Sequence, residues 1–289
     1  MNEVMIIGGG LAGCEAAWQL ARRGCGVKLF DMKPHKFSPA HESEQLGELV
    51  CSNSLRSADP HSAVGLLKEE MRSLDSLIIK SADQTAVPAG RALAVDRELF
   101  ARTITATLAN HRLVTVVREE ITALPENKNG FTILATGPLT SEPLAQSLAE
   151  FTGMSRLYFY DAIAPILHTE SLDLEIIYQK SRYDDGPGDY LNCPLDEADY
   201  LHFINSLNTA RCMPLRNFEE VKYFEGCLPI EVMSSRGVDT LRYGPMKPVG
   251  LENPRTGELP HAVVQLRKEN RQGTLYNMVG FQTKLTHGE

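Results

Sequence analysis

A glycine-rich turn between two apolar strands limits the fold of this chain more than any other feature. The apolar residues 4–7 are followed at once by a Gly-x-Gly-x-x-Gly turn at residues 8–13, which opens a helical pattern. A second apolar run, residues 27–30, then ends on Asp31. A strand, a helix and a second strand in this order predict a βαβ unit, the start of a doubly wound parallel α/β sheet.

The spacing within this unit is typical of a dinucleotide-binding site. Gly8 permits the tight turn, Gly10 lets the backbone approach a pyrophosphate, and Gly13 lets the helix pack closely on the strand. The helix N-terminus adds amide donors and a partial positive charge, and Asp31, about 20 positions further on, is placed to accept ribose hydroxyls. The predicted contacts from the turn itself are Gly8, Gly9, Gly10, Leu11, Ala12 and Gly13.

FAD is the cofactor that the sequence favours. The glycine motif occurs once, whereas a protein that also binds NAD(P)H tightly would usually have a second one. A later apolar run ends in Ala135, Thr136 and Gly137, which resembles the second fingerprint of FAD proteins of the glutathione-reductase type. That segment passes close to the dinucleotide, so these three residues are also predicted cofactor contacts. The expected fold is α/β, a glutathione-reductase-type FAD-binding Rossmann domain with a smaller α+β insertion domain.

Composition agrees with an ordinary globular chain. The 289 residues suggest roughly two domains, with 43% apolar and 23% charged residues. No apolar run approaches the ~20 residues that a bilayer requires, and no signal peptide is recognised at the start. Six cysteines in a chain of this length do not form a disulfide framework. We therefore expect a cytoplasmic, reduced protein with no membrane partner.

A cluster of turn formers and acidic residues at positions 184–189 is the clearest linker signal. It divides the chain into a predicted FAD-binding domain, residues 1–185, and a predicted insertion domain, residues 186–289. The net charge is −8, but residues 200–289 carry 11 Lys/Arg against 9 Asp/Glu. The acidic balance argues against indiscriminate nucleic-acid binding, and a local polyanion site is expected, if anywhere, in the C-terminal third.

Further elements follow from periodicity and turn residues, and residues 32–61 lack periodicity and are expected to form a long functional loop. Helices are expected at residues 62–74, 96–109 and 197–207, with a short one from Pro229. Strands are expected at residues 113–117, 121–124, 131–135 and 221–224, with mixed strand and turn at 158–166 and a hairpin across 262–266 and 274–282.

The cysteines exclude some chemistries and leave two candidates. No two of them lie within four residues, so zinc-ribbon and Cys-x-x-Cys redox motifs are absent. Cys14, Cys25 and Cys212 are interpreted as small buried residues. Cys227 lies just ahead of a predicted helix start, where the helix dipole would stabilise a thiolate, but a buried core position explains it equally well. Cys51 lies among small polar residues of a loop, where exposure is expected.

Several blocks resemble the bacterial folate- and FAD-dependent tRNA uracil-5-methyltransferases, in the same order from end to end. The most specific are Cys-Ser-Asn-Ser and Glu-Gly-Cys-Leu-Pro-Ile-Glu, which contain Cys51 and Cys227. The matching blocks span residues 8–18, 48–56, 67–72, 87–90, 135–140, 224–231, 244–250 and 279–282.

The resemblance implies methylation of uridine 54 in the T-loop of tRNA, with methylenetetrahydrofolate as carbon donor, reduced FAD as reductant and NAD(P)H to recharge the flavin. Cys227 matches the residue proposed in that family to add to uracil C6, which activates C5. Cys51 matches a second functional cysteine near the flavin, with a less settled role. The insertion domain of the family corresponds to the segment after the linker.

Family chains continue well beyond this C-terminal region, so the resemblance implies that this chain is C-terminally incomplete. We expect weak FAD retention and little turnover from it alone. Three alternatives remain open at this point. They are a related FAD-dependent enzyme that modifies the wobble uridine of tRNA, a flavin oxidoreductase acting on a small molecule, and an inactive RNA- or cofactor-binding fragment.

Overall fold

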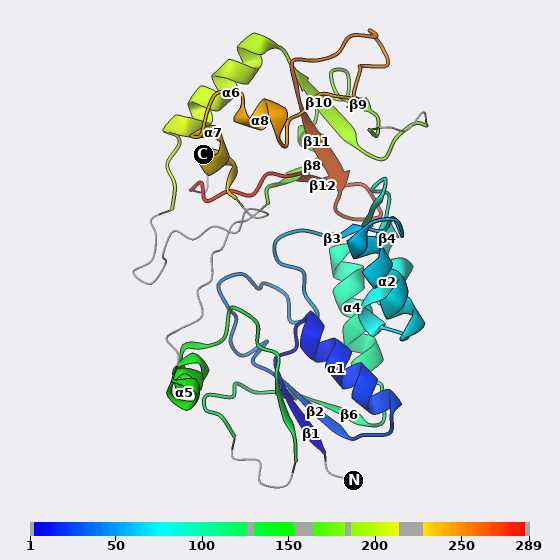
Figure 1. Ribbon diagram of the computed structural model, residues 1–289, viewed down its shortest axis with the longest axis vertical. Coiled ribbons are helices and arrows are strands. Elements are labelled where there is room, and N and C mark those ends of the chain that lie inside the picture. Colours follow the sequence, from blue (N-terminus) through cyan, green and yellow to red (C-terminus); the bar gives the residue numbers. More distant parts are fainter. Residues whose placement is uncertain (1–2, 126–129, 154–163, 183–185, 214–227, 287–289) are drawn as a thin grey trace. The chain divides into compact units, whose positions relative to one another are not determined.

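The computed structural model describes residues 3–125, 130–153, 164–182, 186–213 and 228–286 (Figure 1). The chain forms two compact units. Unit 1 consists of residues 1–50, 56–86 and 95–159, and unit 2 of residues 51–55, 87–94 and 160–289. Each unit therefore contains segments that are far apart in the sequence.

Unit 1 is built on a four-stranded sheet with the order β6-β2-β1-β7, in which every neighbouring pair is parallel. The strands are β1 (Val4–Ile7), β2 (Val27–Asp31), β6 (Val114–Arg118) and β7 (Thr132–Leu134). α1 (Leu11–Arg22) connects β1 to β2, which confirms the predicted βαβ unit. Ile7 pairs with Phe30 on one side and with Leu134 on the other, so the carboxyl ends of these strands lie at one edge.

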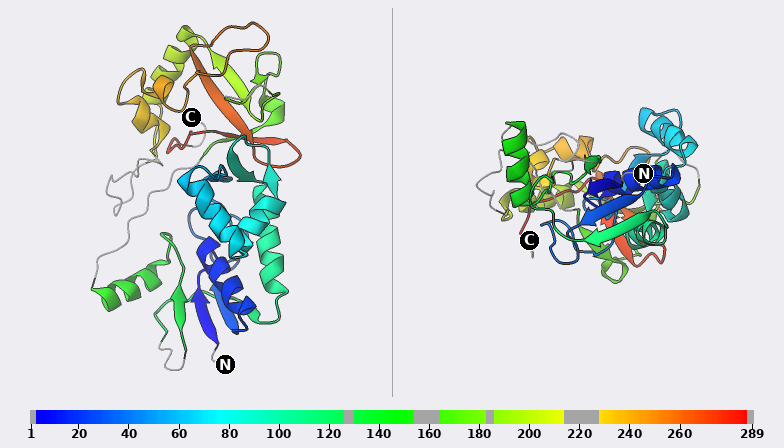
Figure 2. Two further views of the ribbon diagram at one scale, coloured as in Figure 1. Left: turned by 45° about the vertical axis from the view of Figure 1, so that its right-hand side comes forward. Right: turned by 90° about the horizontal axis from the view of Figure 1, so that it is seen from below.

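Three of the other described helices of unit 1 begin at side-chain caps. Ser62, Ser76 and Asp96 accept hydrogen bonds from amides in the first turns of α2, α3 and α4. These helices and α5 span Ala63–Ser73, Leu77–Gln84, Arg97–Ala109 and Glu142–Thr152. α1, α3 and α4 pack together, and Figure 2 shows α5 apart from this group. The predictions of α2 and α4 are confirmed, whereas α3 and α5 were not expected.

One predicted strand of unit 1 is wrong. Residues 121–124 form no strand, although their apolar character is typical of one. The Leu124 amide donates to the Ser147 hydroxyl of α5 at 3.0 Å, so this segment pairs with a helix side chain where a strand would pair with backbone. The predicted strand at residues 221–224 and most of the segment 158–166 lie outside the described residues.

Unit 2 contains an antiparallel sheet with the order β8-β12-β11-β10-β9. Its strands are β8 (Ile166–His168), β9 (Tyr178–Gln179), β10 (Leu191–Leu195), β11 (Ala262–Lys268) and β12 (Leu275–Met278). The helices are α6 (Glu197–Thr209), α7 (Ile230–Ser234), α8 (Thr240–Tyr243) and a 3-10 turn at Thr169–Ser171. The pairing of β11 with β12 confirms the predicted hairpin, and α6 confirms the predicted helix.

A small third sheet has the order β3-β5-β4, formed by Ser54–Ser57, Ala92–Val95 and Ala86–Val87. Each of these strands contains a point at which the chain passes from one unit to the other. β3 lies within residues 32–61, for which no regular element was predicted. Within the described ranges, no helix combines the length and the apolar character needed to cross a bilayer.

Candidate functional site

The glycine turn at the end of β1 is held by close backbone approaches. Gly8 has a φ of +111°, and a Cβ there would lie 2.4 Å from the Ala135 carbonyl oxygen. A Cβ on Gly13 would lie 1.8 Å from the Gly8 carbonyl oxygen. A Cβ on Gly10, in contrast, would meet nothing within 4 Å. The turn therefore lies against the segment after β7 at Gly8 and against its own backbone at Gly13, and it leaves open space at Gly10, the N-cap of α1.

α1 itself is fixed at its sides by polar contacts. The Glu15 carboxylate accepts hydrogen bonds from the Ser76 hydroxyl at 2.8 Å and from the Ile78 amide at 3.1 Å. The Trp18 indole N–H donates to the Asp75 carbonyl at 2.9 Å. These contacts hold α1 against the start of α3, so the amides of its first turn have a fixed direction.

Asp31 is the buried carboxylate at the end of β2. Its Oδ2 accepts from the Gly9 amide at 3.1 Å, and its Oδ1 accepts from the Lys33 amide at 2.8 Å. The Arg118 guanidinium lies 3.9 Å from Oδ1. Each carboxylate oxygen has a second lone pair, so Asp31 both fixes the turn and keeps acceptor capacity for a ligand hydroxyl.

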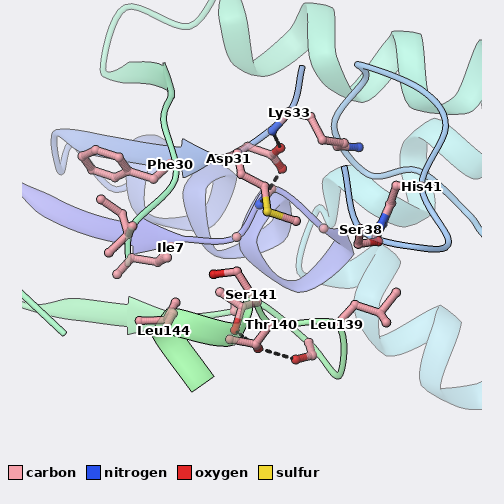
Figure 3. A pocket seen from close by; sticks show the side chains of 18 of the residues that line it. Ile7, Phe30, Asp31, Lys33, Ser38, His41, Leu139, Thr140, Ser141 and Leu144 are labelled. Atoms are coloured by element: carbon pink, nitrogen blue, oxygen red, sulfur yellow. Dashed lines mark hydrogen bonds between the residues drawn. The ribbon is translucent and has the colours of Figure 1, made fainter. Parts of the chain in front are cut away.

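A cavity of about 340 Å³ lies beside the turn, within the usual size of a small-molecule site (Figure 3). Ile7, Phe30 and Leu144 make one end of it apolar, and Lys33 and His41 lie toward the other end. The predicted residues that line it are Gly8, Gly9, Gly10, Leu11, Ala12, Asp31, Ala135, Thr136 and Gly137. Gly13 is not in the lining and acts through packing.

The segment after β7 forms a tight turn over this cavity. The Ala135 amide donates to the Ile7 carbonyl at 2.8 Å. The Thr136 and Thr140 hydroxyls lie 2.6 Å apart, and Thr140 also donates to the Gly137 carbonyl at 2.8 Å. Gly137 has a φ of +65°, which glycine adopts readily. The two predicted glycine-containing segments therefore meet at one cavity, although they are more than 120 residues apart.

An ion pair that the sequence analysis missed forms another part of the cavity wall. The Lys33 ammonium lies 3.1 Å from Glu48 Oε2, and these side chains are 6% and 10% exposed. Lys33 also donates to the Gln45 carbonyl at 2.6 Å. Glu48 Oε1 accepts from the amides of Glu42 and Ser43 at 2.9 and 3.0 Å. The pair thus holds the two ends of residues 33–48 together. The sequence analysis predicted only that these residues belong to a long functional loop.

His41 also lines the cavity, and no role was predicted for it. Its Nδ1 lies 2.5 Å from the Ser38 hydroxyl, with which it shares a hydrogen bond. Burial, reinforced by the nearby Lys33 charge, lowers the pKa of His41 below its usual value of 6.5. The neutral imidazole is therefore favoured at this end of the cavity.

The cysteines differ in exposure. Cys14 is fully buried, as predicted, and burial raises the pKa of its thiol to about 12. Cys51 is exposed, as predicted, and directly follows Val50 of the cavity lining. The interpretation of Cys25 and Cys212 as buried residues is met only in part by Cys25, which is half-buried, and is wrong for Cys212, which is exposed. It lies in an isolated bridge with Leu285, outside the apolar cluster of unit 2.

The second predicted catalytic cysteine, Cys227, lies outside the described residues. The helix expected from Pro229 is present as α7, with Pro229 as its N-cap and Ile230 as its first residue. The Ile230 amide donates to the Gln282 carbonyl at 2.7 Å, which anchors the helix start to the C-terminal segment.

Comparison with protein families identifies the group to which this fold belongs. The profile of the family described as glucose inhibited division protein A matches residues 3–289. The chain belongs to this family. A solved structure of GidA from Aquifex aeolicus has the same fold, with a TM-score of 0.64 at 14% identity over 98% of this chain and 50% of that one. The α/β fold with a parallel sheet is therefore that of the family.

Two relatives carry a name that describes an activity. The proteins from Desulfotalea psychrophila and Anoxybacillus flavithermus are both named methylenetetrahydrofolate--tRNA-(uracil-5-)-methyltransferase TrmFO. The first is 66% identical over 100% of this chain and 65% of its own length. The second is 59% identical over 99% of this chain and 66% of its own length. The chain therefore spans about two thirds of the length of the curated relatives it matches.

Proposed function

We propose that this chain is part of an enzyme that methylates uridine 54 of tRNA at C5, with methylenetetrahydrofolate as carbon donor, reduced FAD as reductant and NAD(P)H as the source of electrons. The observation that carries the proposal is the 66% identity, over the whole chain, to a protein named for this reaction. The cavity at the glycine turn and the exposed Cys51 supply a nucleotide site and a thiol in the same chain.

The residues around the cavity fit the dinucleotide part of FAD. The open space at Gly10 admits a pyrophosphate to the α1 amides, where the helix dipole favours negative charge. The fixed Asp31 carboxylate would accept the ribose hydroxyls, and Ala135, Thr136 and Gly137 would lie along the same ligand. When bound and reduced, FAD supplies the hydride that converts a one-carbon unit on the base into a methyl group.

The proposed role of Cys227 is nucleophilic addition. Its thiolate would form a bond to uracil C6, the electrons of the C5–C6 double bond would move to C5, and C5 would then bond to the one-carbon unit while the bonds from that carbon to the folate nitrogens break. Loss of the C5 proton and departure of the thiolate restore the double bond. Cys51 is proposed as a second functional cysteine near the flavin, and its exposure supports access to a ligand.

We also propose an insertion domain and a cytoplasmic location for the enzyme. The sequence-based boundary is at residue 186, but the sheet of unit 2 includes β8 and β9, which precede it. An insertion domain that starts before β8 therefore has better support than one that starts at residue 186. The cytoplasmic proposal rests on the proposed tRNA substrate.

The test uses the purified chain, loaded with FAD, and a tRNA transcript that contains 5-fluorouridine. A covalent protein–RNA adduct that survives denaturation is expected with the unchanged chain and absent from Cys227→Ala. Cys212→Ala is the matched control, because Cys212 is an exposed thiol of the same unit with no proposed role. An adduct of equal yield in Cys227→Ala would contradict the mechanism. Mass mapping of an unmodified transcript after turnover separates uridine 54 from the wobble position.

A further inference from the structure

β11 has two different faces, as expected for a strand whose side chains alternate. Ala262, Val264 and Leu266 belong to the apolar cluster that also contains residues of α6. Gln265 and Arg267 point to the opposite face and are nevertheless only 8% and 6% exposed. Unit 2 therefore buries polar side chains on one side of its sheet.

The neighbouring strands continue this polar face. Asn192 of β10 pairs with Gln265, and Asn277 of β12 pairs with Arg267. Both asparagines are at most 2% exposed. The Gln265 amide donates to Asn192 Oδ1 at 3.1 Å, so part of the network holds the sheet together.

Arg267 reaches beyond the sheet to the segment that follows Cys51. Its Nε donates to Asn53 Oδ1 at 3.0 Å, and its Nη2 donates to the Ser52 hydroxyl at 3.0 Å. Asn53 Nδ2 in turn donates to the Lys268 carbonyl at 2.9 Å. These bonds join positions more than 200 residues apart within unit 2.

The two hydrogen bonds from this side chain to Asn53 and Ser52 require an arginine. A guanidinium presents donors in a rigid planar fork and can bind two neighbouring acceptors at once, whereas an ammonium is a point charge on a flexible stem. A buried cation is a weak source of net stability, because its desolvation opposes the bonds that it forms. The specific effect of Arg267 is therefore geometric: it fixes two consecutive residues next to an exposed cysteine.

We infer that Arg267 is a positioning residue for Cys51. Asn53 and Ser52 transmit its fixed position to the backbone, so the Cys51 thiol projects from the protein in one orientation. The expected effect of Arg267 on the rate of methylation rests on the proposed function. The anchoring of residues 51–55 can be measured without it.

The experiment compares two variants, Arg267→Lys and Asn53→Ala, with the unchanged chain. Arg236→Lys is the matched control, because it makes the same arginine-to-lysine change at an exposed position of the same unit. Hydrogen exchange of the amides at residues 51–55 is measured first, with α6 as internal reference. We expect exchange about tenfold faster at residues 51–55 in the first two variants, with α6 unchanged. Arg236→Lys should match the unchanged chain.

Methylation of a tRNA transcript by the FAD-loaded chain is then measured for the same proteins. A positioning role predicts kcat lower by about tenfold with the KM for tRNA within twofold, because misplacement of a reacting group reduces turnover more than binding. Unchanged exchange in both variants, or faster exchange with unchanged kcat, overturns the inference. An unchanged chain that forms no covalent adduct with the 5-fluorouridine transcript contradicts the proposed function, while its exchange data still decide whether Arg267 anchors the segment.

Discussion

Two walls of the same cavity are built in different ways. One wall is the glycine turn and the segment after β7, where a Cβ on Gly8 or Gly13 would collide with a backbone carbonyl. The other is formed by residues 33–48, where a buried ion pair and a half-buried imidazole hold the loop. The close backbone contacts of the turn require glycines, which have no Cβ, whereas the ion pair requires the charged side chains of Lys33 and Glu48. The two walls should therefore respond differently to small substitutions.

The largest effect is expected for Gly13→Ala. The new Cβ would lie 1.8 Å from the Gly8 carbonyl, which forces the turn to move and costs roughly 3–5 kcal/mol of stability. Gly10→Ala is the matched control, since a Cβ there meets nothing within 4 Å. Urea unfolding should show a loss only in Gly13→Ala, and flavin titration should show weaker FAD binding in both variants. Equal stabilities would contradict the assignment of Gly13 to packing.

Glu48→Gln should have the next largest effect. It leaves the Lys33 ammonium buried without its countercharge, which costs about 3 kcal/mol. Glu98→Gln removes the carboxylate from an exposed pair with Arg102 on α4, and a change of at most about 0.5 kcal/mol is expected. Chemical denaturation of the two variants checks the difference. A loss below about 1 kcal/mol in Glu48→Gln would mean that the loop wall does not depend on the pair.

Asp31→Asn tests the carboxylate that accepts hydrogen bonds from both walls, from the Gly9 amide and from the Lys33 amide. The amide keeps one acceptor oxygen but turns an N–H₂ group toward a backbone N–H of Gly9 or Lys33, so we expect a loss of about 1–2 kcal/mol. FAD affinity should fall by about tenfold, because a ribose hydroxyl loses its charged acceptor. Isothermal titration with FAD and urea unfolding measure the two effects. Unchanged affinity would restrict Asp31 to its structural contacts.

The smallest effect is expected for the pH dependence that His41 contributes. Its pKa is lowered in the folded protein by burial and by Lys33, so the unfolded chain takes up the proton first. The stabilising contribution is present above about pH 6.5 and is lost as the pH falls through the folded pKa. The urea midpoint should therefore fall less between pH 7.5 and 5 in His41→Gln than in the unchanged chain. The exposed His61→Gln should behave like the unchanged chain.

The parts of the fold that follow local rules could be predicted from the sequence. The βαβ unit, the helix capped by Asp96 and the β11–β12 hairpin each depend on periodicity or turn residues within a short window. α3 could not be predicted in this way, because its apolar start at Leu77 is as typical of a buried strand. The strand expected at residues 121–124 was wrong, and the Leu124 amide of this segment donates to a hydroxyl of α5, a contact that no local pattern indicates.

In the candidate site, too, residues in local sequence patterns could be predicted and residues that meet through long-range contacts could not. The glycines and Asp31 were found because a phosphate-binding turn requires defined residue types at defined spacing, and the Ala135 segment was found through its resemblance to the second fingerprint of FAD proteins. Lys33, Glu48 and Arg267 were not found, since nothing near Lys33 in the sequence indicates that it will be buried against Glu48. The contact of Arg267 with Asn53 spans 214 positions and depends on the fold of unit 2. Side-chain pairing over such separations leaves no local pattern.

The burial of Cys14 affects which thiols of the protein peroxide can oxidise. Reduced flavins pass electrons to dioxygen and release peroxide, which attacks thiolates far faster than thiols. Cys14 lies inside the helix that begins at the glycine turn, yet its thiol remains protonated and donates to the Gly9 carbonyl at 3.3 Å. Cys14 is therefore poorly able to react with peroxide although it lies in the helix of the proposed cofactor site, and oxidation of the exposed Cys51 should precede oxidation of Cys14.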